Sequence, residues 1–254
     1  MKLSVVIPAR DESGCIDATL RTLLDALRAS AIPSEIIVVD DGSRDSTADL
    51  VRGLAVRNPE IVLVRNQGRH GFGMAVRAGL KQMTGDAVAI MMADSSDSPD
   101  DLVSYYRKLA EGWDCVFGSR FIQGGKLHDY PAHKLLINRA ANWFIKALFR
   151  LRLNDTTNAF KAYRREVIEG IQPLISPHFN LTVEMPLKAI VRGYSYTTIP
   201  ITWTNRQAGV SKLKLKEMGS RYLFIVMYIW LERMLARGDY HRRNAGEPVK
   251  PTHV

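Results

Sequence analysis

The chain has 254 residues, of which 46% are apolar, so it is long enough to bury a core within one large domain. Its formal net charge of +9 at pH 7 indicates an anionic partner: nucleic acid, anionic lipid or a phosphorylated substrate. Cys15 and Cys115 are too few for a disulfide framework, and residues 1–7 form too short an apolar run for a signal peptide. These features exclude a disulfide-stapled fold and predict a cytoplasmic protein.

Strand and helix patterns alternate from residue 3 to residue 99. Short β-rich runs bounded by turn residues are typical of strands, and apolar residues spaced by three and four are typical of helices. By these patterns the strands are predicted at 3–7, 35–39, 61–64 and 87–92, and the helices at 16–27, 46–56, 75–83 and from Pro99 onward. This order predicts an α/β fold with a mostly parallel sheet flanked by helices.

Acidic residues follow two of the predicted strands. Asp40 and Asp41 end the second strand, and Asp94 ends the apolar run at 88–93. Ligands of open α/β sheets bind at the carboxyl ends of strands, where a carboxylate can bind a ribose or base, or hold a metal. Helix capping near Ser43 and an ordinary solvated turn after Asp94 explain the same residues, and both interpretations stand at this point.

A glycine-rich stretch, residues 68–73, lies just before the helix at 75–83. Glycines there would let the backbone approach a ligand closely. The spacing differs from the G-x-G-x-x-G fingerprint of dinucleotide-binding proteins, and the first strand carries no such motif. The sequence therefore disfavours a dinucleotide-dependent dehydrogenase.

Basic residues gather in the middle of the chain, where seven Lys or Arg lie between residues 120 and 152 against a single acid, Asp129. Within residues 134–151 the polar residues recur every four positions, at Lys134, Asn138, Asn142 and Lys146, and apolar residues fill most of the rest. One interpretation is a partly buried core helix. The other is a helix in a lipid interface with its polar stripe toward the active site, because basic and aromatic residues favour a membrane surface over a nucleic-acid groove.

A second apolar run, residues 221–231, ends at Glu232 and Arg233. It is too short to cross a bilayer, which takes about 20 residues, so we expect it to lie on a membrane or pack against another helix. The tail at 238–254 is polar and is predicted to be disordered.

Six segments, in order, resemble the family-2 glycosyltransferases of the GT-A fold, most closely the dolichyl or polyprenyl phosphate mannose synthase branch. They are VIPARDE at 6–12, VVDDGS at 38–43, NQG at 66–68 with Gly71 and Gly73, GSRF at 118–121, DTTNAFKAY at 155–163 and RQAGVSK at 206–212. The resemblance implies a Rossmann-like GT-A domain over residues 1–215, including an amphipathic helix at about 131–151. An interfacial helix at 216–237 and the tail would follow.

The resemblance also implies a nucleotide-sugar donor site and an acceptor site. The donor residues implied are Pro8, Ala9, Glu12, Asp40 and Asp41 for the nucleotide, and Arg206, Ser211 and Lys212 in a loop over the diphosphate. Groups for the acceptor phosphate are Arg120, Lys134 and Asn138, although the family usually has Arg and Ser at the last two positions, and Lys lacks the bidentate fork of Arg. Asp94, Arg120 and Glu184 are the implied catalytic residues. Glu184 could equally be an acid on a helix surface.

One departure from the family concerns the metal motif. Where the family usually reads Asp-Ala-Asp, this chain has Met92-Ala93-Asp94, and Ser96 stands where a Gln often follows. A thioether is not a ligand for Mg²⁺ or Mn²⁺, but Mg²⁺ keeps waters and can use one carboxylate plus donor phosphates. We therefore expect Mg²⁺ or Mn²⁺ at Asp94, with Ser96 and Asp97 beside it. Alternatively, Asp97 caps the helix that Pro99 opens.

The expected function is an inverting transfer of a mannose- or glucose-like sugar from a nucleotide-diphosphate sugar to a polyprenyl phosphate. The protein would be peripheral on the cytoplasmic, inner face of a membrane, and no nucleic acid is involved. An acceptor phosphate is already ionised and needs no general base, whereas a hydroxyl acceptor would need one. Three alternatives stay open: a transferase with a soluble acceptor, a degenerate nucleotide-sugar binder that lacks activity, and a lipid-binding scaffold.

Overall fold

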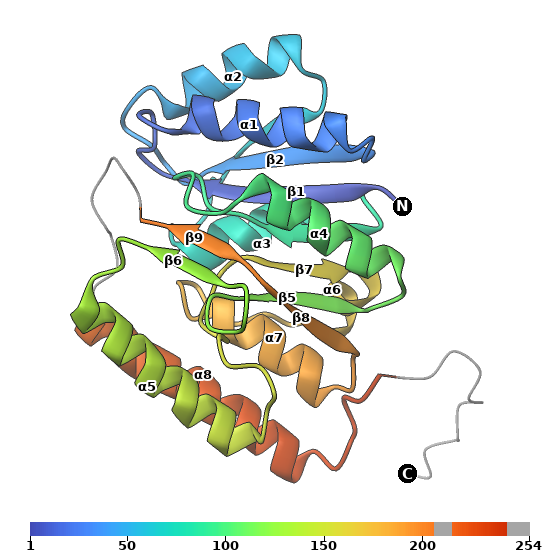
Figure 1. Ribbon diagram of the computed structural model, residues 1–254, viewed down its shortest axis with the longest axis vertical. Helices are drawn as coiled ribbons and strands as arrows, with labels where there is room; N and C mark the ends of the chain where they lie inside the picture. Colours follow the sequence, from blue (N-terminus) through green and yellow to red (C-terminus); the bar gives the residue numbers. More distant parts are fainter. Residues whose placement is uncertain (206–214, 243–254) are drawn as a thin grey trace.

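The computed structural model describes residues 1–205 and 215–242 (Figure 1). Its main sheet has seven strands in the order β3-β2-β1-β4-β7-β5-β8, and β6 and β9 form a small second sheet. The strands are β1 Leu3–Ala9, β2 Ser34–Asp40, β3 Ile61–Arg65, β4 Ala87–Ile90, β5 Cys115–Ser119, β6 Lys126–His128, β7 Lys161–Arg164, β8 Tyr196–Pro200 and β9 Thr202–Thr204. The helices are α1 Ile16–Ala29, α2 Thr47–Arg57, α3 Phe72–Gln82, α4 Pro99–Ala110, α5 Ala132–Phe149, α6 Arg165–Gly170, α7 Leu181–Val191 and α8 Leu215–Leu235.

The main sheet is mostly parallel, which confirms the predicted α/β class. β1 pairs in parallel with β2 and β4, and β2 pairs in parallel with β3. β7 is antiparallel to both β4 and β5, while β5 and β8 are parallel. The carboxyl ends of β1, β2 and β4 therefore share one edge of the sheet, where ligands of such folds bind.

The sheet is buried on both faces, which explains the continuous apolar runs of its strands. Val5 and Ile7 of β1 pack into a core with α1, α2 and α4, whereas Val6 packs on the opposite face with α3 and α7. The eight strands and helices predicted up to Pro99 are present within a few residues of their predicted bounds. β4 ends at Ile90, two residues before the predicted end at Met92, because the chain turns away there to form the loop that carries Asp94.

α5 and α8 lie side by side along the outer edge of the molecule and run in the same direction (Figure 1). The Arg233 guanidinium donates to the Phe149 carbonyl at 2.7 Å, joining their carboxyl-terminal ends. α8 buries Ile225, Val226 and Ile229 in the core. Within residues 1–205 and 215–242, the structure contains no helix that is both long and apolar enough to cross a membrane.

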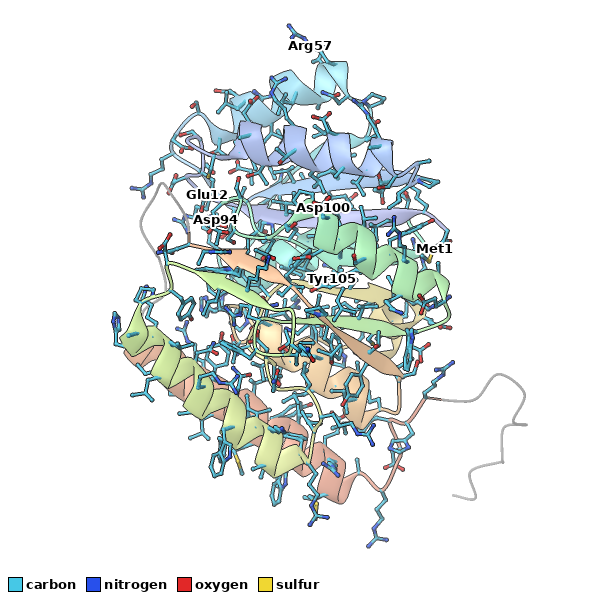
Figure 2. All side chains as sticks on the ribbon, viewed as in Figure 1. Met1, Glu12, Arg57, Asp94, Asp100 and Tyr105 are labelled. Atoms are coloured by element: carbon cyan, nitrogen blue, oxygen red, sulfur yellow. The ribbon has the colours of Figure 1, made fainter. Side chains whose placement is uncertain are left out.

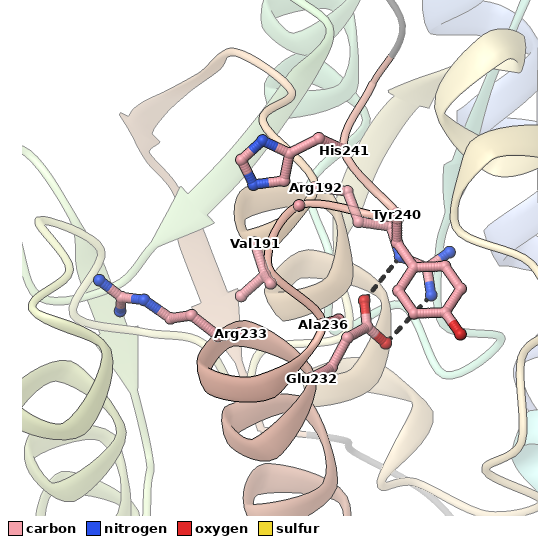
Figure 3. A pocket seen from close by; sticks show the side chains of 8 residues that line it. Val191, Arg192, Glu232, Arg233, Ala236, Tyr240 and His241 are labelled. Atoms are coloured by element: carbon pink, nitrogen blue, oxygen red, sulfur yellow. Dashed lines mark hydrogen bonds and ion pairs between the residues drawn. The ribbon is translucent and has the colours of Figure 1, made fainter. Parts of the chain in front are cut away.

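The start of the predicted tail packs against the end of α7 (Figure 3). Arg192 makes a bidentate ion pair with Glu232 of α8 at 2.8 and 3.1 Å, and the ring of Tyr240 covers the Arg192 guanidinium. Arg242 donates its backbone N–H to the Arg192 carbonyl and its guanidinium to Asp114. These contacts fasten the end of α8 to the domain, and residues 243–254 of the tail lie outside the described residues.

Candidate active site

The predicted donor residues converge at the carboxyl edge of the sheet. Pro8 and Ala9 end β1, and Ala9 pairs in register with Asp40 at the end of β2. The Asp41 backbone N–H donates to the Ala9 carbonyl at 2.9 Å. Figure 2 places Glu12 and Asp94 at this same edge, beside the ends of β1 and β4. The backbone thus gathers the predicted nucleotide residues at one edge of the sheet.

For the acids after β2, the sequence left two roles open, ligand binding and helix capping. Asp40 is buried, and its Oδ1 accepts the Ser43 N–H at 2.9 Å, closing the turn after β2. Asp45 Oδ1 accepts the Thr47 N–H at the start of α2, also at 2.9 Å. Hydrogen bonds from Thr47 and Ser13 outweigh the effect of burial and hold the pKa of Asp45 well below its usual range. The N-cap of α2 is Ser46, and the preceding Asp45 accepts the first N–H of the helix, whereas Asp40 closes the turn after β2.

Asp41 organises the glycine-rich loop. Its Oδ1 accepts the Asn66 side-chain amide at 2.6 Å and lies 3.2 Å from His70 Nδ1. Its Oδ2 accepts the Gly71 N–H at 2.8 Å. Asp41 was predicted to contact the donor, but these three partners make it the anchor of the loop beside the donor site. The sequence carried no signal for His70, because its partner lies 29 residues away.

Gly71 and Gly73 of this loop allow close packing of the chain. Gly71 has a φ of +144°, and a Cβ there would lie 2.5 Å from the Pro177 carbonyl oxygen. A Cβ at Gly73 would collide with the Ser176 carbonyl oxygen. Met74 donates its N–H to the same Pro177 carbonyl at 3.2 Å. The start of α3 is therefore pressed against the segment that precedes α7.

Asp94 lies in a tight turn directly after β4. Its Oδ1 accepts the Ser96 N–H at 3.2 Å, and Ser95 adopts a φ of +58°. The Thr19 hydroxyl of α1 donates to the Ala93 carbonyl at 2.9 Å and lies 2.6 Å from the Ser95 hydroxyl. Asp94 itself is 7% exposed. The turn therefore holds one carboxylate in a fixed position at the edge of the sheet.

Asp97 folds back onto the end of β4. Its Oδ2 accepts the Met92 N–H at 2.9 Å. Burial, assisted by the charge of Asp94, raises the pKa of Asp97 to about 7. The cap of α4 is Ser98, so the alternative in which Asp97 caps that helix is wrong. Asp97 instead stabilises the turn that carries Asp94.

A hard cation such as Mg²⁺ or Mn²⁺ fits this turn when substrate phosphates and water supply most of its ligands. Among the described residues, no group of three His, Cys, Asp or Glu could hold a metal ion. Asp94 supplies a fixed carboxylate, and Ser96 and Asp97 add buried oxygen atoms in the same turn. Mg²⁺ and Mn²⁺ accept such a sparse protein site when substrate phosphates and water complete their shell.

Arg120 follows β5 and is held by a partner that the sequence did not reveal. Its guanidinium makes a bidentate pair with the Asp155 carboxylate at 2.8 and 2.7 Å, and its N–H donates to the same carboxylate at 3.1 Å. Burial alone would lower the pKa of Arg120, but Asp155 outweighs it and raises that pKa. The rings of Phe121, Tyr130 and Trp203 lie 5.3 to 6.0 Å from the guanidinium carbon. A cation is therefore held rigidly among aromatic rings.

The predicted acceptor residues of α5 attach to the same loop as Arg120. The Asn138 amide donates to the Thr157 hydroxyl at 2.9 Å, and Arg139 donates to the Asn154 carbonyl at 3.0 Å. Lys134 is half-buried and lies one turn before Asn138. The loop at 154–157 thus positions both Arg120 and the first half of α5. Within the polar stripe of α5, Asn138 and Asn142 face inward and bond to Thr157, whereas Lys146 is exposed.

Glu184 is enclosed by its own segment of the chain. It is fully buried, and its two oxygens accept the N–H groups of Ile175 at 2.8 Å and Ser176 at 2.7 Å. Lys188 of the same helix pairs with it at 2.8 Å. This geometry favours a structural role, clamping the segment before α7, over the predicted catalytic one. Neither is Glu184 the helix-surface acid of the alternative interpretation.

A buried lysine behind the site also escaped the sequence analysis. Lys161 in β7 donates to the carbonyls of Thr156 at 3.0 Å and Thr182 at 3.3 Å, and to that of Asn158. Burial lowers the pKa of Lys161 to about 7. It joins the loop that holds Arg120 to the start of α7. The predicted diphosphate residues Arg206, Ser211 and Lys212 lie outside the described residues.

Known proteins share this architecture. Among solved structures, the glucosyl-3-phosphoglycerate synthase of Mycobacterium tuberculosis, crystallised with Mn²⁺, UDP-glucose and phosphoglyceric acid, matches with a TM-score of 0.68 at 19% identity. The match covers 91% of this chain and 79% of that one. It shows a common GT-A fold.

Sequence comparison gives the family. The polyprenol monophosphomannose synthase of Mycolicibacterium smegmatis is 32% identical over 215 residues, which cover 82% of this chain and 80% of that protein. The dolichol-phosphate mannosyltransferase of Pyrococcus furiosus is 31% identical over 85% of this chain, although the match spans 60% of that protein. A family model described as glycosyl transferase family 2 matches residues 4–171. With this match across most of its length, the chain is a member of glycosyl transferase family 2.

Proposed function

We propose that the protein is an inverting glycosyltransferase that moves a mannose- or glucose-like sugar from a nucleotide-diphosphate donor to a polyprenyl phosphate. The observation that carries this proposal is the similarity to the polyprenol monophosphomannose synthase over most of both chains. The rigid pair of Arg120 and Asp155 supports it, because a fixed cation suits an anionic acceptor oxygen.

The chemistry asked of this chain is mainly binding and orientation. Pro8, Ala9, Glu12 and Asp40 would hold the nucleotide at the edge of the sheet, with Asp41 fixing the neighbouring loop. Arg206, Ser211 and Lys212 would contact the diphosphate. Arg120, Lys134 and Asn138 would hold the acceptor phosphate in line with the sugar carbon. That phosphate is already ionised, so the buried position of Glu184 costs the reaction nothing.

Asp94, with Ser96 and Asp97 in the same turn, would hold a divalent cation. When bound, Mg²⁺ or Mn²⁺ would neutralise negative charge on the departing nucleoside diphosphate. The hydrogen bonds from Ser96 to Asp94 and from Met92 to Asp97 would fix these carboxylates before the donor arrives. Met92 lowers the number of protein oxygens, so the donor phosphates carry more of the coordination.

A peripheral position on a membrane forms part of the proposal. Large apolar side chains are exposed along the outer helices, namely Leu136, Ile137, Trp143 and Phe144 of α5 and Leu223, Phe224, Leu231 and Met234 of α8. Exposed apolar surface of this extent marks an interaction site. A lipid interface would cover it and would present a lipid-linked phosphate to Arg120 from the side of α5. We propose residues 1–215 as the transferase domain and α8 as its second interfacial helix.

Turnover with defined substrates tests the proposal. The purified full chain would be incubated with GDP- or UDP-sugars and a polyprenyl phosphate in detergent, with Mg²⁺, with Mn²⁺ or with excess EDTA. Metal-dependent formation of a lipid-linked sugar phosphate is the expected result. Transfer to phosphoglyceric acid alone would assign a soluble acceptor, and nucleotide-sugar binding without transfer to either would identify a degenerate binder.

A further inference from the structure

Lys161 of β7 is a buried cation to which the proposed function gives no part. It is 1% exposed, and its side-chain partners are three backbone carbonyls, those of Thr156, Asn158 and Thr182. An ammonium group has three N–H donors, whereas a neutral amine has two. The three carbonyls therefore each have a donor only while the lysine carries its proton.

One of these carbonyls is made available by a proline. In a regular helix the Thr182 carbonyl would accept the N–H of residue 186, four positions later. That residue is Pro186, which lies inside α7 and has no N–H. The Lys161 ammonium donates to the Thr182 carbonyl at 3.3 Å and so supplies the missing donor. The lysine of β7 and the proline of α7 are therefore matched, although they lie in separate elements.

The other two carbonyls belong to the loop that holds Arg120. Asp155 of this loop binds the Arg120 guanidinium at 2.8 and 2.7 Å. It directly precedes Thr156, whose carbonyl accepts from Lys161 at 3.0 Å. Lys161 thus connects the loop to β7 and to the first turn of α7. A shift of the loop away from Lys161 would move the carboxylate that fixes Arg120.

The charges around Lys161 decide how firmly it keeps its proton. Burial lowers the pKa of Lys161 to about 7, although Asp155 and Asp97 favour the ammonium form; Arg120 disfavours it. The acid and the lysine of α7 pair with each other at 2.8 Å and add no net charge. Asp155 is itself bound to Arg120, so the ammonium group depends on the three carbonyls for its stabilisation.

We propose that Lys161 is a positioning residue for the acceptor site, and that its charged form fastens the loop at 154–158 to β7 and α7 and thereby holds Arg120 in place. Because it is buried, Lys161 acts through the loop and not on a substrate. The binding of an acceptor by Arg120 rests on the proposed function, whereas the fastening of the loop does not. Loss of the proton leaves one carbonyl without a donor, so affinity for the acceptor phosphate should fall as the pH rises.

Affinity for an acceptor probe tests the proposal. Binding of farnesyl phosphate to the full chain would be measured by calorimetry at pH 6 and pH 9 for the wild type, Lys161→Met and Lys81→Met. The last is the matched control, since it removes an exposed lysine of α3. At pH 6, Lys161→Met should bind about tenfold more weakly than the wild type, and Lys81→Met should bind equally.

The comparison between the two pH values is the decisive part of this experiment. At pH 9 the wild type should lose most of its advantage over Lys161→Met, because its own lysine has then lost the proton. Ionisation of farnesyl phosphate affects all three proteins alike and cancels in the ratio. An advantage of equal size at both pH values, or none at either, would overturn the proposal.

Stability separates positioning from a purely structural role. Because burial lowers the pKa of Lys161 from 10.5 to about 7, the unfolded chain binds this proton more tightly than the folded protein does. The contribution of the lysine to stability should therefore rise between pH 6 and pH 9. Its contribution to acceptor affinity should fall over the same range. Urea unfolding of the wild type and Lys161→Met measures the first quantity, and a change of both in the same direction would assign a structural role only.

Hydrogen exchange of the free protein needs no acceptor. The N–H groups of Arg120 and Thr157 donate to the side chains of Asp155 and Asn142 at 3.1 and 3.2 Å. In Lys161→Met these two amides should exchange at least about tenfold faster at pH 6, while the amides of β1 keep their wild-type rates. In the wild type, their protection relative to β1 should fall between pH 6 and pH 9, a comparison that requires no substitution.

The two kinds of measurement distinguish the possible failures. Unchanged exchange in the loop, in the variant and across pH in the wild type, would overturn the proposal even if farnesyl phosphate binds. Faster exchange in a protein that does not bind farnesyl phosphate would contradict the proposed acceptor, and it would support the role of Lys161 in holding Arg120.

Discussion

Met92 marks the position where this chain differs most clearly from the family motif. Its backbone N–H is bonded to Asp97, and its side chain is half-buried. Asp97 thus bonds back to the residues just after β4 and closes the turn that contains Asp94. The sequence identified both acids, but it could not show that one of them shapes the turn for the other.

The first prediction concerns Asp94. Asp94→Asn should lower turnover at least about 100-fold, because it removes the fixed charge that would anchor the cation. Met92→Asp should fold and should lower the Mg²⁺ concentration that gives half-maximal rate, since it adds a hard oxygen ligand. Rates measured across a metal titration check both. Wild-type turnover by Asp94→Asn at every metal concentration would rule out this role.

The second prediction concerns Glu35, far from the site. Burial alone would raise its pKa, but hydrogen bonds from Ser4, Thr84 and Lys2 outweigh burial and lower that pKa to about 2. The folded state therefore favours the carboxylate, and this stability is present above the unfolded pKa of 4.5 and is lost as the pH falls toward 2.

Urea unfolding of the wild type and Glu35→Gln checks this linkage. At pH 7 the variant should be less stable by about 3 kcal/mol. At pH 3 the difference should fall by more than half, since the wild type has by then lost most of the contribution. A difference that stays constant between the two pH values would show that the ionisation of Glu35 is not the cause.

Among the helices and strands, the sequence predicted best those strands that are buried on both faces of the sheet and the helices between them. Strands β1 to β4 are apolar runs closed by turn residues, and the helices between them keep a regular apolar spacing. β7 gave no such signal, because it is four residues long and includes Lys161 and Arg164. Its direction, antiparallel to both neighbours, depends on pairings that no local pattern encodes.

In the candidate site, some residues could likewise be predicted from the sequence and others could not. Strand-end acids such as Asp40 and Asp94 were visible because a turn follows each strand. The partners of Arg120 and Asp41 were not, since a hydrogen bond between residues 29 or 35 positions apart leaves no trace in spacing. The family resemblance implied a catalytic role for Glu184, whereas its full burial and its bonds to Ile175 and Ser176 favour a structural one.

The third prediction tests the contact between α3 and the segment before α7. Gly71→Ala should lower the free energy of unfolding by about 2 kcal/mol or more, because the φ of +144° and the Pro177 carbonyl both oppose a Cβ. The matched control is Gly53→Ala in the interior of α2, where a Cβ meets nothing within 4 Å. That variant should gain up to about 1 kcal/mol. Equal effects of the two substitutions on the melting temperature would refute the packing explanation.

At the scale of the whole molecule, the apolar surface is unevenly distributed. α1, α2 and α4 cover one face of the sheet and bury their apolar residues in its core, whereas α5 and α8 leave large apolar residues outside. Trp143 is 70% exposed and Leu136 is 73% exposed, both on α5. One side of the protein is thus a typical water-exposed surface, and the opposite side has the character of an interface.

The fourth prediction follows from this asymmetry. Trp143→Ser should weaken binding to anionic vesicles about tenfold, because a large aromatic side chain loses its place among the lipids. Val56→Ser, which changes an apolar residue 84% exposed on α2, is the matched control and should bind as the wild type does. High salt should weaken binding of all three proteins without abolishing it. Identical partitioning of the two variants in a sedimentation assay would remove α5 from the interface.

The loop at 154–157 couples the position of Arg120 to that of α5. Asp155 of this loop binds Arg120, while Asn154 and Thr157 accept hydrogen bonds from Arg139 and Asn138 of α5. One short segment therefore contacts both the arginine and the helix. A shift of α5 would displace this loop. The Arg120 guanidinium would move with the loop, because two hydrogen bonds fix it to Asp155. At the proposed lipid interface, the depth of α5 would therefore set the position of the Arg120 guanidinium.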